Sequence, residues 1–212
     1  AALGSTINGE PITEETKLAS VKDQSAYSTS KFYAEMEVWR AINSGLDAVI
    51  LNPSVILGAG DWKTSSSTFI STIAKGLSFY SNGVTGFVDV RDVAQASRLA
   101  LESTVSAERF VLSAENISYY NLFCNIAKSL NKPTPKFKAY PILLKSIATI
   151  SSFYSYITGR DPLVTPQSAR SAWRKCYYSG RKFEEQFGVK YTPISQTIDF
   201  ACRCYLNSNR KK

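Results

Sequence analysis

Residues 47–55 (DAVILNPSV) form a short apolar run that contains several β-branched side chains. The run is bounded by Gly45 and Gly58, and its apolar and polar residues do not alternate. This pattern is typical of a strand buried on both faces, as the strands of parallel sheets are. The preceding residues 26–43 lack Gly and Pro and predict a helix of about five turns. A helix that leads into a buried strand favours an α/β fold.

The alternation of strand and helix patterns continues to residue 130. Residues 1–25 are rich in turn-forming side chains and predict a loop. Helices are expected at 64–76, at 92–102 with Asp92 at its start, and at 118–130 opened by Ser118, and strands at 84–90 and 110–113. This order predicts a parallel α/β sheet over residues 1–130.

The composition changes after residues 131–135. Residues 141–158 are apolar and aromatic, with Lys145 as their one charged residue. Their length reaches the lower limit of a membrane span, but four serines lie within them, which favours a helix buried against a ligand cleft or core. We therefore expect no membrane span. Residues 131–212 are predicted to be mainly helical, with a helix after Ser179 and a last helix after Pro193.

The chain contains no histidine, which excludes a Ser-His-Asp triad, a Cys-His dyad and a His-built zinc site within it. Proton chemistry would have to use Tyr, Lys, Cys or carboxylates. The four cysteines form no CxxC pair, so we expect no metal site. No secretory leader pattern starts the chain, and reduced thiols in a cytoplasmic protein are expected.

The net charge of +8 is unevenly distributed. Residues 1–130 carry 10 basic and 13 acidic side chains, whereas residues 131–212 carry 15 basic and 4 acidic ones. A basic segment can meet nucleic acid, an anionic membrane or an anionic ligand, or it can simply be a solvated surface. Since no nucleic-acid-binding motif is present, nucleic acid is the disfavoured partner.

Two Tyr-x-x-x-Lys spacings occur, Tyr27/Lys31 and Tyr178/Lys182. Tyr27 lies in the first turn of the predicted helix 26–43, and a four-residue offset places Lys31 on the same helical face. A nearby ammonium favours phenolate and lowers the pKa of a tyrosine, which suits proton exchange with an alcohol. The alternative is a half-exposed Tyr and a solvated Lys on an ordinary helix.

Four motifs in order resemble the extended short-chain dehydrogenase/reductase superfamily, which includes the NAD-dependent epimerase/dehydratase family. They are the runs 27–35, 49–58 and 87–94, and Tyr178–Lys182 with the Phe187-Gly188 turn and Pro193 that follow. The resemblance implies a Rossmann-type parallel sheet with a small, mostly helical substrate-binding region. It also implies that Tyr178/Lys182 is part of a structural element.

The resemblance also implies roles for individual residues. Tyr27 would be the catalytic acid/base, and Lys31 its partner and a ligand of the cofactor ribose. Pro53, Ser54 and Val55 would lie against the nicotinamide end of NADP or NAD, with Asn52 close by. The alternative for residues 52–55 is simply a strand end that leads into a turn. A homodimer through the helix of Tyr27 would be common in the superfamily.

Two departures from the family pattern narrow the interpretation. No Gly-x-x-Gly-x-x-Gly loop is present, so the chain resembles the carboxy-terminal part of such an enzyme. Residues 1–130 would be the second half of a Rossmann-type domain, with substrate-loop segments at 58–90. Residues 131–212 would be the substrate-binding region and the final helices. Thr85 stands where nucleotide-sugar epimerases tend to carry a phosphate-binding Arg.

With Thr85 at that position, the apolar segment 141–158 and residues 160–165 resemble the dihydroflavonol-reductase and 3β-hydroxysteroid-dehydrogenase branch. The expected function is an NAD(P)-dependent oxidoreductase that acts on a ketone or alcohol of an apolar small molecule. The alternatives are a nucleotide-sugar epimerase or dehydratase, and a non-catalytic binding module.

Overall fold

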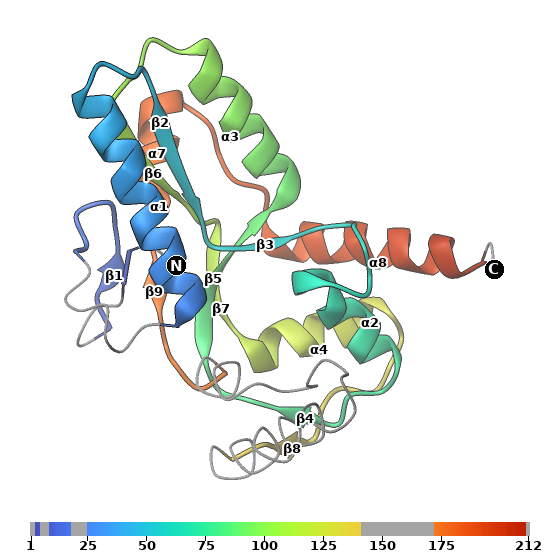
Figure 1. The fold of residues 1–212 in the computed structure, drawn as a ribbon. Helices are drawn as coiled ribbons and strands as arrows, with labels where there is room; N and C mark the ends of the chain where they lie inside the picture. Colours follow the sequence, from blue (N-terminus) through green and yellow to red (C-terminus); the bar gives the residue numbers. More distant parts are fainter. Residues whose placement is uncertain (1–2, 5–8, 18–24, 141–171, 211–212) are drawn as a thin grey trace, which may run out of the picture.

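The computed structural model describes residues 3–4, 9–17, 25–140 and 172–210, so the predicted helix within 141–158 lies outside the described residues (Figure 1). The helices are α1 (Ala26–Asn43), η1 (Ser65–Ser67), α2 (Thr68–Ala74), α3 (Val90–Glu102), α4 (Tyr119–Ser129), α7 (Arg181–Phe187) and α8 (Ile194–Arg210). The strands are β1 (Pro11–Ile12), β2 (Val49–Pro53), β3 (Val55–Leu57), β4 (Phe79–Tyr80), β5 (Val84–Asp89), β6 (Glu108–Leu112), β7 (Glu115–Ser118), β8 (Phe137–Lys138) and β9 (Tyr177–Tyr178).

Parallel pairing dominates the strands, which confirms the predicted α/β class. β2 pairs with β6 from Val49↔Glu108 to Pro53↔Leu112, and β3 pairs with β5. β1 with β9 and β4 with β8 are also parallel, whereas β5 and β7 are antiparallel. Because helices lie between the parallel strands in sequence, each parallel pair is reached by a crossover rather than a hairpin.

The predicted strand 47–55 is divided at Ser54. β2 ends at Pro53 while it is paired with β6, and β3 begins at Val55 with β5 as its partner. The Ser54 amide still donates to the Leu112 carbonyl oxygen at 2.9 Å, so the chain changes partner strand within one residue. Sequence pattern alone reads this run as one strand because its apolar character is continuous.

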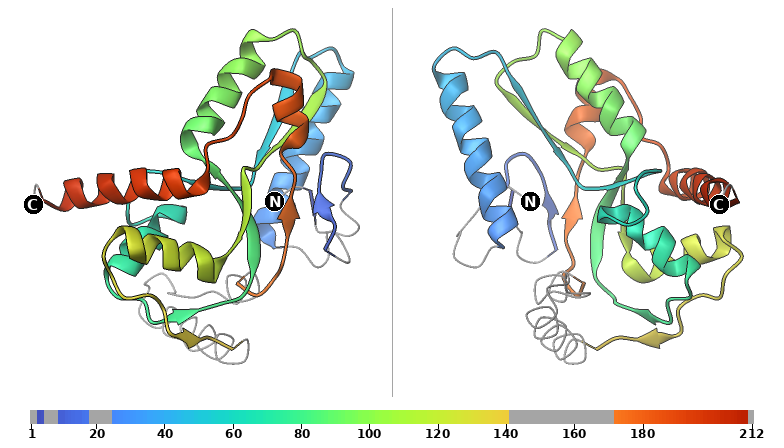
Figure 2. Two further views of the ribbon diagram at one scale, coloured as in Figure 1. Left: turned by 180° about the vertical axis from the view of Figure 1, so that it is seen from behind. Right: turned by 45° about the vertical axis from the view of Figure 1, so that its right-hand side comes forward.

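Two hydrophobic cores lie on opposite faces of β5. Phe87 belongs to a core built by α2, α4 and α8, whereas Val88 belongs to a core built by α3, β6 and α7. Both side chains are fully buried. Successive side chains of a strand point to opposite faces, so these neighbours enter different cores. Figure 2 shows α8 and α4 on one side of the molecule and α3 with α7 on the other.

The expected helix boundaries are largely confirmed. α1 spans the predicted 26–43, and Ser118 caps α4 by accepting a hydrogen bond from the Asn121 amide. The prediction for Asp92 is wrong, because α3 begins at Val90 and its cap is Asp89. Asp92 instead lies in the first turn and accepts hydrogen bonds from the amide and hydroxyl of Thr192.

All four cysteines lie in the described part of the chain and are free thiols. Within the described ranges, no group of His, Cys, Asp and Glu side chains is arranged to hold a metal ion. No helix of those ranges combines the length and the apolar character that a membrane crossing requires.

The buried carboxylate of Asp89 ties α3 to α8. Asp89 is 1% exposed and accepts hydrogen bonds from the Arg91 amide, the Arg91 guanidinium and the Thr197 hydroxyl. Burial by itself raises the pKa of Asp89, but the hydrogen bonds from Arg91 and Thr197 outweigh it and leave the pKa below its ordinary value. Folding therefore favours the ionised form of this carboxyl.

We predict that Asp89→Asn lowers the free energy of unfolding at neutral pH by about 1 to 3 kcal/mol, because charge-assisted hydrogen bonds are lost. The contribution of a carboxyl whose pKa is depressed on folding is present above its unfolded-state pKa and is lost as the pH falls through the folded-state pKa. The difference in the free energy of unfolding between Asp89→Asn and the unaltered chain should therefore become smaller in acid. Urea unfolding at several pH values measures it, with the exposed Asp47→Asn as control. An equal deficit at every pH would contradict the prediction.

Candidate functional site

Tyr27 and Lys31 lie together on the first two turns of α1. The helix begins at Ala26, where the Ser25 hydroxyl accepts a hydrogen bond from the Ser28 amide at 2.9 Å. The Lys31 ammonium lies 5.6 Å from the centroid of the Tyr27 ring, and Tyr27 is 62% exposed. The predicted Tyr/Lys face is thus formed, and it is accessible from solvent.

The tyrosine end of α1 lies near the carboxyl end of β2. α1 runs beside β2 in the opposite direction (Figure 1), and the Glu35 carboxylate accepts a hydrogen bond from the Asn52 amide at 3.1 Å. Tyr27 precedes Glu35 by eight residues, or about 12 Å along the helix axis, which places it past the end of the strand. Ligands of α/β sheets bind at this carboxyl edge.

In the segment 52–55, some polar groups are hydrogen-bonded and one buried hydroxyl is not. The Asn52 side-chain amide donates a hydrogen bond to the Glu35 carboxylate, and the Ser54 backbone amide donates one to the Leu112 carbonyl oxygen. By contrast, the Ser54 hydroxyl oxygen is buried and has no hydrogen-bond partner among the described residues. The Ser113 hydroxyl, at the end of neighbouring β6, is in the same condition. Buried polar atoms are rarely left unpaired, so these two hydroxyls mark a place where a ligand or water belongs.

Gly86 of β5 allows the strand ends that carry these two hydroxyls to lie close to β5. A Cβ at this position would lie 2.4 Å from the Ser113 hydroxyl oxygen and 3.0 Å from the Ser54 Cβ. A side chain at position 86 would therefore collide with both strand ends. The absence of a side chain on β5 lets the carboxyl ends of β2 and β6 approach it.

A buried acidic group, Glu35, positions the Tyr/Lys helix. Its carboxylate is ion-paired with Arg109 at 2.8 Å and also accepts a hydrogen bond from Trp39 at 3.3 Å. Arg109 in turn donates to the Glu14 carbonyl oxygen, and the Glu14 carboxylate accepts from the Val111 amide. Glu35 and Arg109 were not predicted as site residues. The available signal was the spacing of four, because positions 27, 31, 35 and 39 share one helical face.

The second Tyr/Lys pair is structural. The Lys182 ammonium is ion-paired with Glu108 at 2.6 Å and donates to the Arg109 carbonyl oxygen at 3.1 Å. Tyr178 pairs through its backbone with the Asn116 side chain, and burial raises its pKa to about 12. A phenol with this pKa is a poor proton donor or acceptor at neutral pH.

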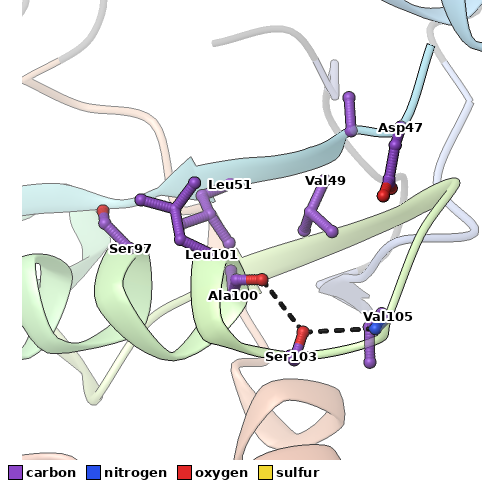
Figure 3. Close-up of a pocket in the computed structure, with 9 residues that line it drawn as sticks. Asp47, Val49, Leu51, Ser97, Ala100, Leu101, Ser103 and Val105 are labelled. Atoms are coloured by element: carbon purple, nitrogen blue, oxygen red, sulfur yellow. Dashed lines mark hydrogen bonds between the residues drawn. The ribbon is translucent and has the colours of Figure 1, made fainter.

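Cavities lie beside these elements but are not lined by the Tyr/Lys pair. One of about 400 Å³ lies between β2 and α3, where Leu51 and Leu101 face each other (Figure 3). Another of about 250 Å³ is lined by residues of α1, including Phe32, Glu35 and Trp39, and by Arg109. Neither is lined by Tyr27 or Lys31.

Comparison with known proteins decides the family. Residues 3–113 match the family described as NAD dependent epimerase/dehydratase, and this range includes Tyr27, Lys31 and the segment 52–55. The chain belongs to the NAD-dependent epimerase/dehydratase family. Its strands and helices are accordingly those of a Rossmann-type α/β fold.

Relatives of this family member carry reductase names. A putative dihydroflavonol 4-reductase from Synechocystis is 28% identical over 98% of this chain and 62% of its own length. Tetraketide alpha-pyrone reductase 2 from Arabidopsis thaliana is 40% identical over 42% of this chain and 29% of its own length. The crystal structure of gox2253 is 27% identical with a TM-score of 0.78, and the match covers all of this chain and 65% of that one. The chain thus spans less than two thirds of these proteins.

The residues of this family member fit one end of a nicotinamide dinucleotide. Lys31 has no ion-pair partner among the described residues, and the Ser54 hydroxyl has no described hydrogen-bond partner, so both can serve ribose hydroxyls and the carboxamide. The 212 residues contain no Gly-x-x-Gly-x-x-Gly loop for the pyrophosphate. The fit is therefore to the nicotinamide–ribose end.

We predict that Glu35→Ala lowers the free energy of unfolding by about 3 kcal/mol, because it leaves the half-buried Arg109 guanidinium without its charged partner. Urea unfolding followed by circular dichroism measures the loss. Glu37→Ala provides the matched control on the same helix, since the Glu37–Arg40 pair is exposed and should contribute less than about 1 kcal/mol. Equal losses in the two variants would show that Glu35 does not anchor α1.

Proposed function

We propose that this chain provides the proton-transfer and nicotinamide-proximal part of an NAD(P)-dependent oxidoreductase. The observation that carries the proposal is the exposed Tyr27/Lys31 pair past the carboxyl end of β2, on a helix fixed by Glu35. The reaction interconverts a ketone and an alcohol on an apolar small molecule. Family membership supports the reaction class, and the reductase names of the relatives support this branch of the family.

Tyr27 is the proposed acid/base. In the direction of reduction, the nicotinamide supplies a hydride to the carbonyl carbon when it is bound. The Tyr27 hydroxyl gives its proton to the carbonyl oxygen, so that the product is the alcohol and the tyrosine is left as phenolate. In the reverse direction the phenolate takes the proton from the alcohol.

Lys31 supports this step in two ways. Its ammonium lies 5.6 Å from the centroid of the Tyr27 ring, where its positive charge would stabilise the phenolate left after proton transfer. Its three N–H donors also suit the ribose hydroxyls, so one side chain can orient the cofactor and adjust the base. By binding the ribose, Lys31 would hold the cofactor near Tyr27.

Residues 52–55 are proposed to lie against the nicotinamide. Pro53 has no amide hydrogen and the Ser54 backbone amide is already bonded to Leu112, so polar recognition would fall to the unpartnered Ser54 hydroxyl. Asn52 contributes by holding Glu35, and thereby the helix of Tyr27, in place.

An apolar substrate is favoured over a sugar nucleotide. Thr85 is half-buried on β5 opposite Ile117 and carries no guanidinium to bind a diphosphate in a bidentate manner. Two relatives are named for a dihydroflavonol and for an alpha-pyrone, which are ring compounds without a diphosphate. A ligand of this kind is held chiefly by apolar contacts.

The wider organisation is part of the same proposal. Residues 1–130 supply the second half of the dinucleotide-binding domain, and residues 131–212 supply the substrate-binding region and the final helices. α1 exposes Tyr33 and Met36, which supports a homodimer through this helix. The four free thiols support a reducing, cytoplasmic location.

We predict that Tyr27→Phe in the full-length protein reduces kcat by at least about a hundredfold, because the proton donor is lost. The measurement is NADPH oxidation in the presence of aryl ketones. Tyr33→Phe is the matched control, since Tyr33 is 56% exposed on the same helix. Unchanged turnover in Tyr27→Phe would refute the proposed role. Turnover of UDP-sugars in place of ketones would assign the site to the epimerase branch.

We also predict that these 212 residues alone bind NADP(H) weakly, because they contain no glycine-rich phosphate loop. Titration calorimetry of the 212-residue chain measures this, with a full-length reductase of the family as positive control. Micromolar affinity in the 212-residue chain would contradict the prediction.

A further inference from the structure

The strands β4 and β8 form a two-stranded ribbon with aromatic side chains on both faces. Phe79 pairs with Phe137 and Tyr80 with Lys138 in parallel register. Tyr80 contacts Tyr120 of α4 at a ring distance of 4.3 Å, which fixes one face of the ribbon to the body of the protein. Phe79 and Phe137 occupy the opposite face, because neighbouring side chains of a strand alternate.

The outward face of this ribbon is apolar and accessible. Phe79 is 50% exposed, Phe137 is 59% exposed, and their ring centroids lie 5.7 Å apart. Tyr140, two residues after β8, is 63% exposed. A cavity of about 240 Å³ beside the ribbon is lined by Leu77, Pro133, Lys136 and Phe137 together with Gly76, Ser78 and Thr134. Phenylalanine rings grouped on a surface mark an interaction site more strongly than scattered apolar side chains do.

The described segments that carry and flank the ribbon are basic in sequence. The described ranges 62–88, 116–140 and 172–180 contain no Asp or Glu. Their basic residues are Lys63, Lys75, Lys128, Lys132, Lys136, Lys138, Arg174 and Lys175. None of these is ion-paired with a described residue; Lys138 instead lies over the rings of Tyr140 and Trp173. The Ser129 hydroxyl of α4 donates a hydrogen bond to Asp199 of α8.

This arrangement matches the chemistry of an anionic lipid surface. Aromatic rings settle at the headgroup level of a bilayer, and lysines beside them are attracted to anionic headgroups. A nucleic acid needs open ring faces on which bases can stack. Here the two phenylalanine rings contact each other, and Tyr80 is covered by Tyr120. The pattern therefore favours lipid over nucleic acid.

We propose that the β4–β8 ribbon is a peripheral membrane contact that holds the protein on anionic bilayers without crossing them. Phe79 and Phe137 enter the interface, while Lys132 and Lys136 contact the headgroups. This assignment is independent of Tyr27 and of the proposed reaction. It also assigns anionic lipid as a partner of the basic segment 131–212.

Co-flotation of the full chain with vesicles tests the proposal. Vesicles of phosphatidylcholine with phosphatidylserine should bind the protein, vesicles of phosphatidylcholine alone should bind it weakly, and added salt should weaken the binding. The pair Lys132→Glu with Lys136→Glu should reduce binding at least tenfold, since each lysine near the surface contributes about fivefold. The pair Phe79→Ser with Phe137→Ser should reduce binding on the same vesicles to a similar extent.

Matched control variants distinguish a specific role of the ribbon in vesicle binding from a general effect of the protein's charge or exposed apolar surface. Lys190→Glu with Arg203→Glu changes two exposed charges elsewhere, and Leu101→Ser removes an apolar side chain that is 87% exposed on α3. Both controls should bind vesicles like the unaltered chain, and thermal unfolding should show that all variants are folded. Failure of the unaltered chain to bind, or equal binding by ribbon variants and controls, would overturn the proposal. Binding to a single-stranded oligonucleotide but not to vesicles would also overturn it.

Discussion

The ion pair between Glu35 and Arg109 is the contact on which the arrangement of the site depends. α1 has few buried side chains, so apolar packing alone fixes it loosely, and Glu35 is its buried residue. A buried carboxylate requires partners, and it obtains them from β2, β6 and its own helix through Asn52, Arg109 and Trp39. The orientation of Tyr27 and Lys31 relative to the strand ends follows from these bonds. The amino-terminal segment is held by the same residues, because Arg109 also reaches the Glu14 carbonyl oxygen.

Much of the fold could be predicted from local pattern. The helix 26–43 was expected with its observed limits, since the absence of Gly and Pro and the glycine that follows the last turn are local signals. The parallel pairing of β2 was expected from its continuous apolar character. The change of partner at Ser54 was not expected, because it depends on strands that lie far away in sequence. The cap at Asp89 was also missed, although its hydrogen bond from the Arg91 amide spans only two residues. The bond that ties Asp89 to α8 is not local, since Thr197 is 108 positions from Asp89.

The site was predictable only in part for the same reason. Tyr27 and Lys31 are four residues apart, so their proximity follows from helix geometry. Glu35 lies 74 positions from Arg109, and no local signal links the two residues. The two unpartnered hydroxyls likewise become neighbours only when β2, β5 and β6 are assembled around Gly86. Chemistry carried by one helix can be found in a sequence, whereas the residues that position it require the folded chain.

The placement of Phe87 and Val88 in two different cores has a consequence for how the molecule comes apart. β5 contributes one face to each core, so the loss of packing in either core exposes one face of this strand. Asp89, the next residue, adds a polar bond from the same strand to α8. Local opening that spreads from either side must therefore release β5, and with it the other side. β6, which holds α1 through Arg109, and α4, which contacts the β4–β8 ribbon, are thereby joined into one cooperative unit.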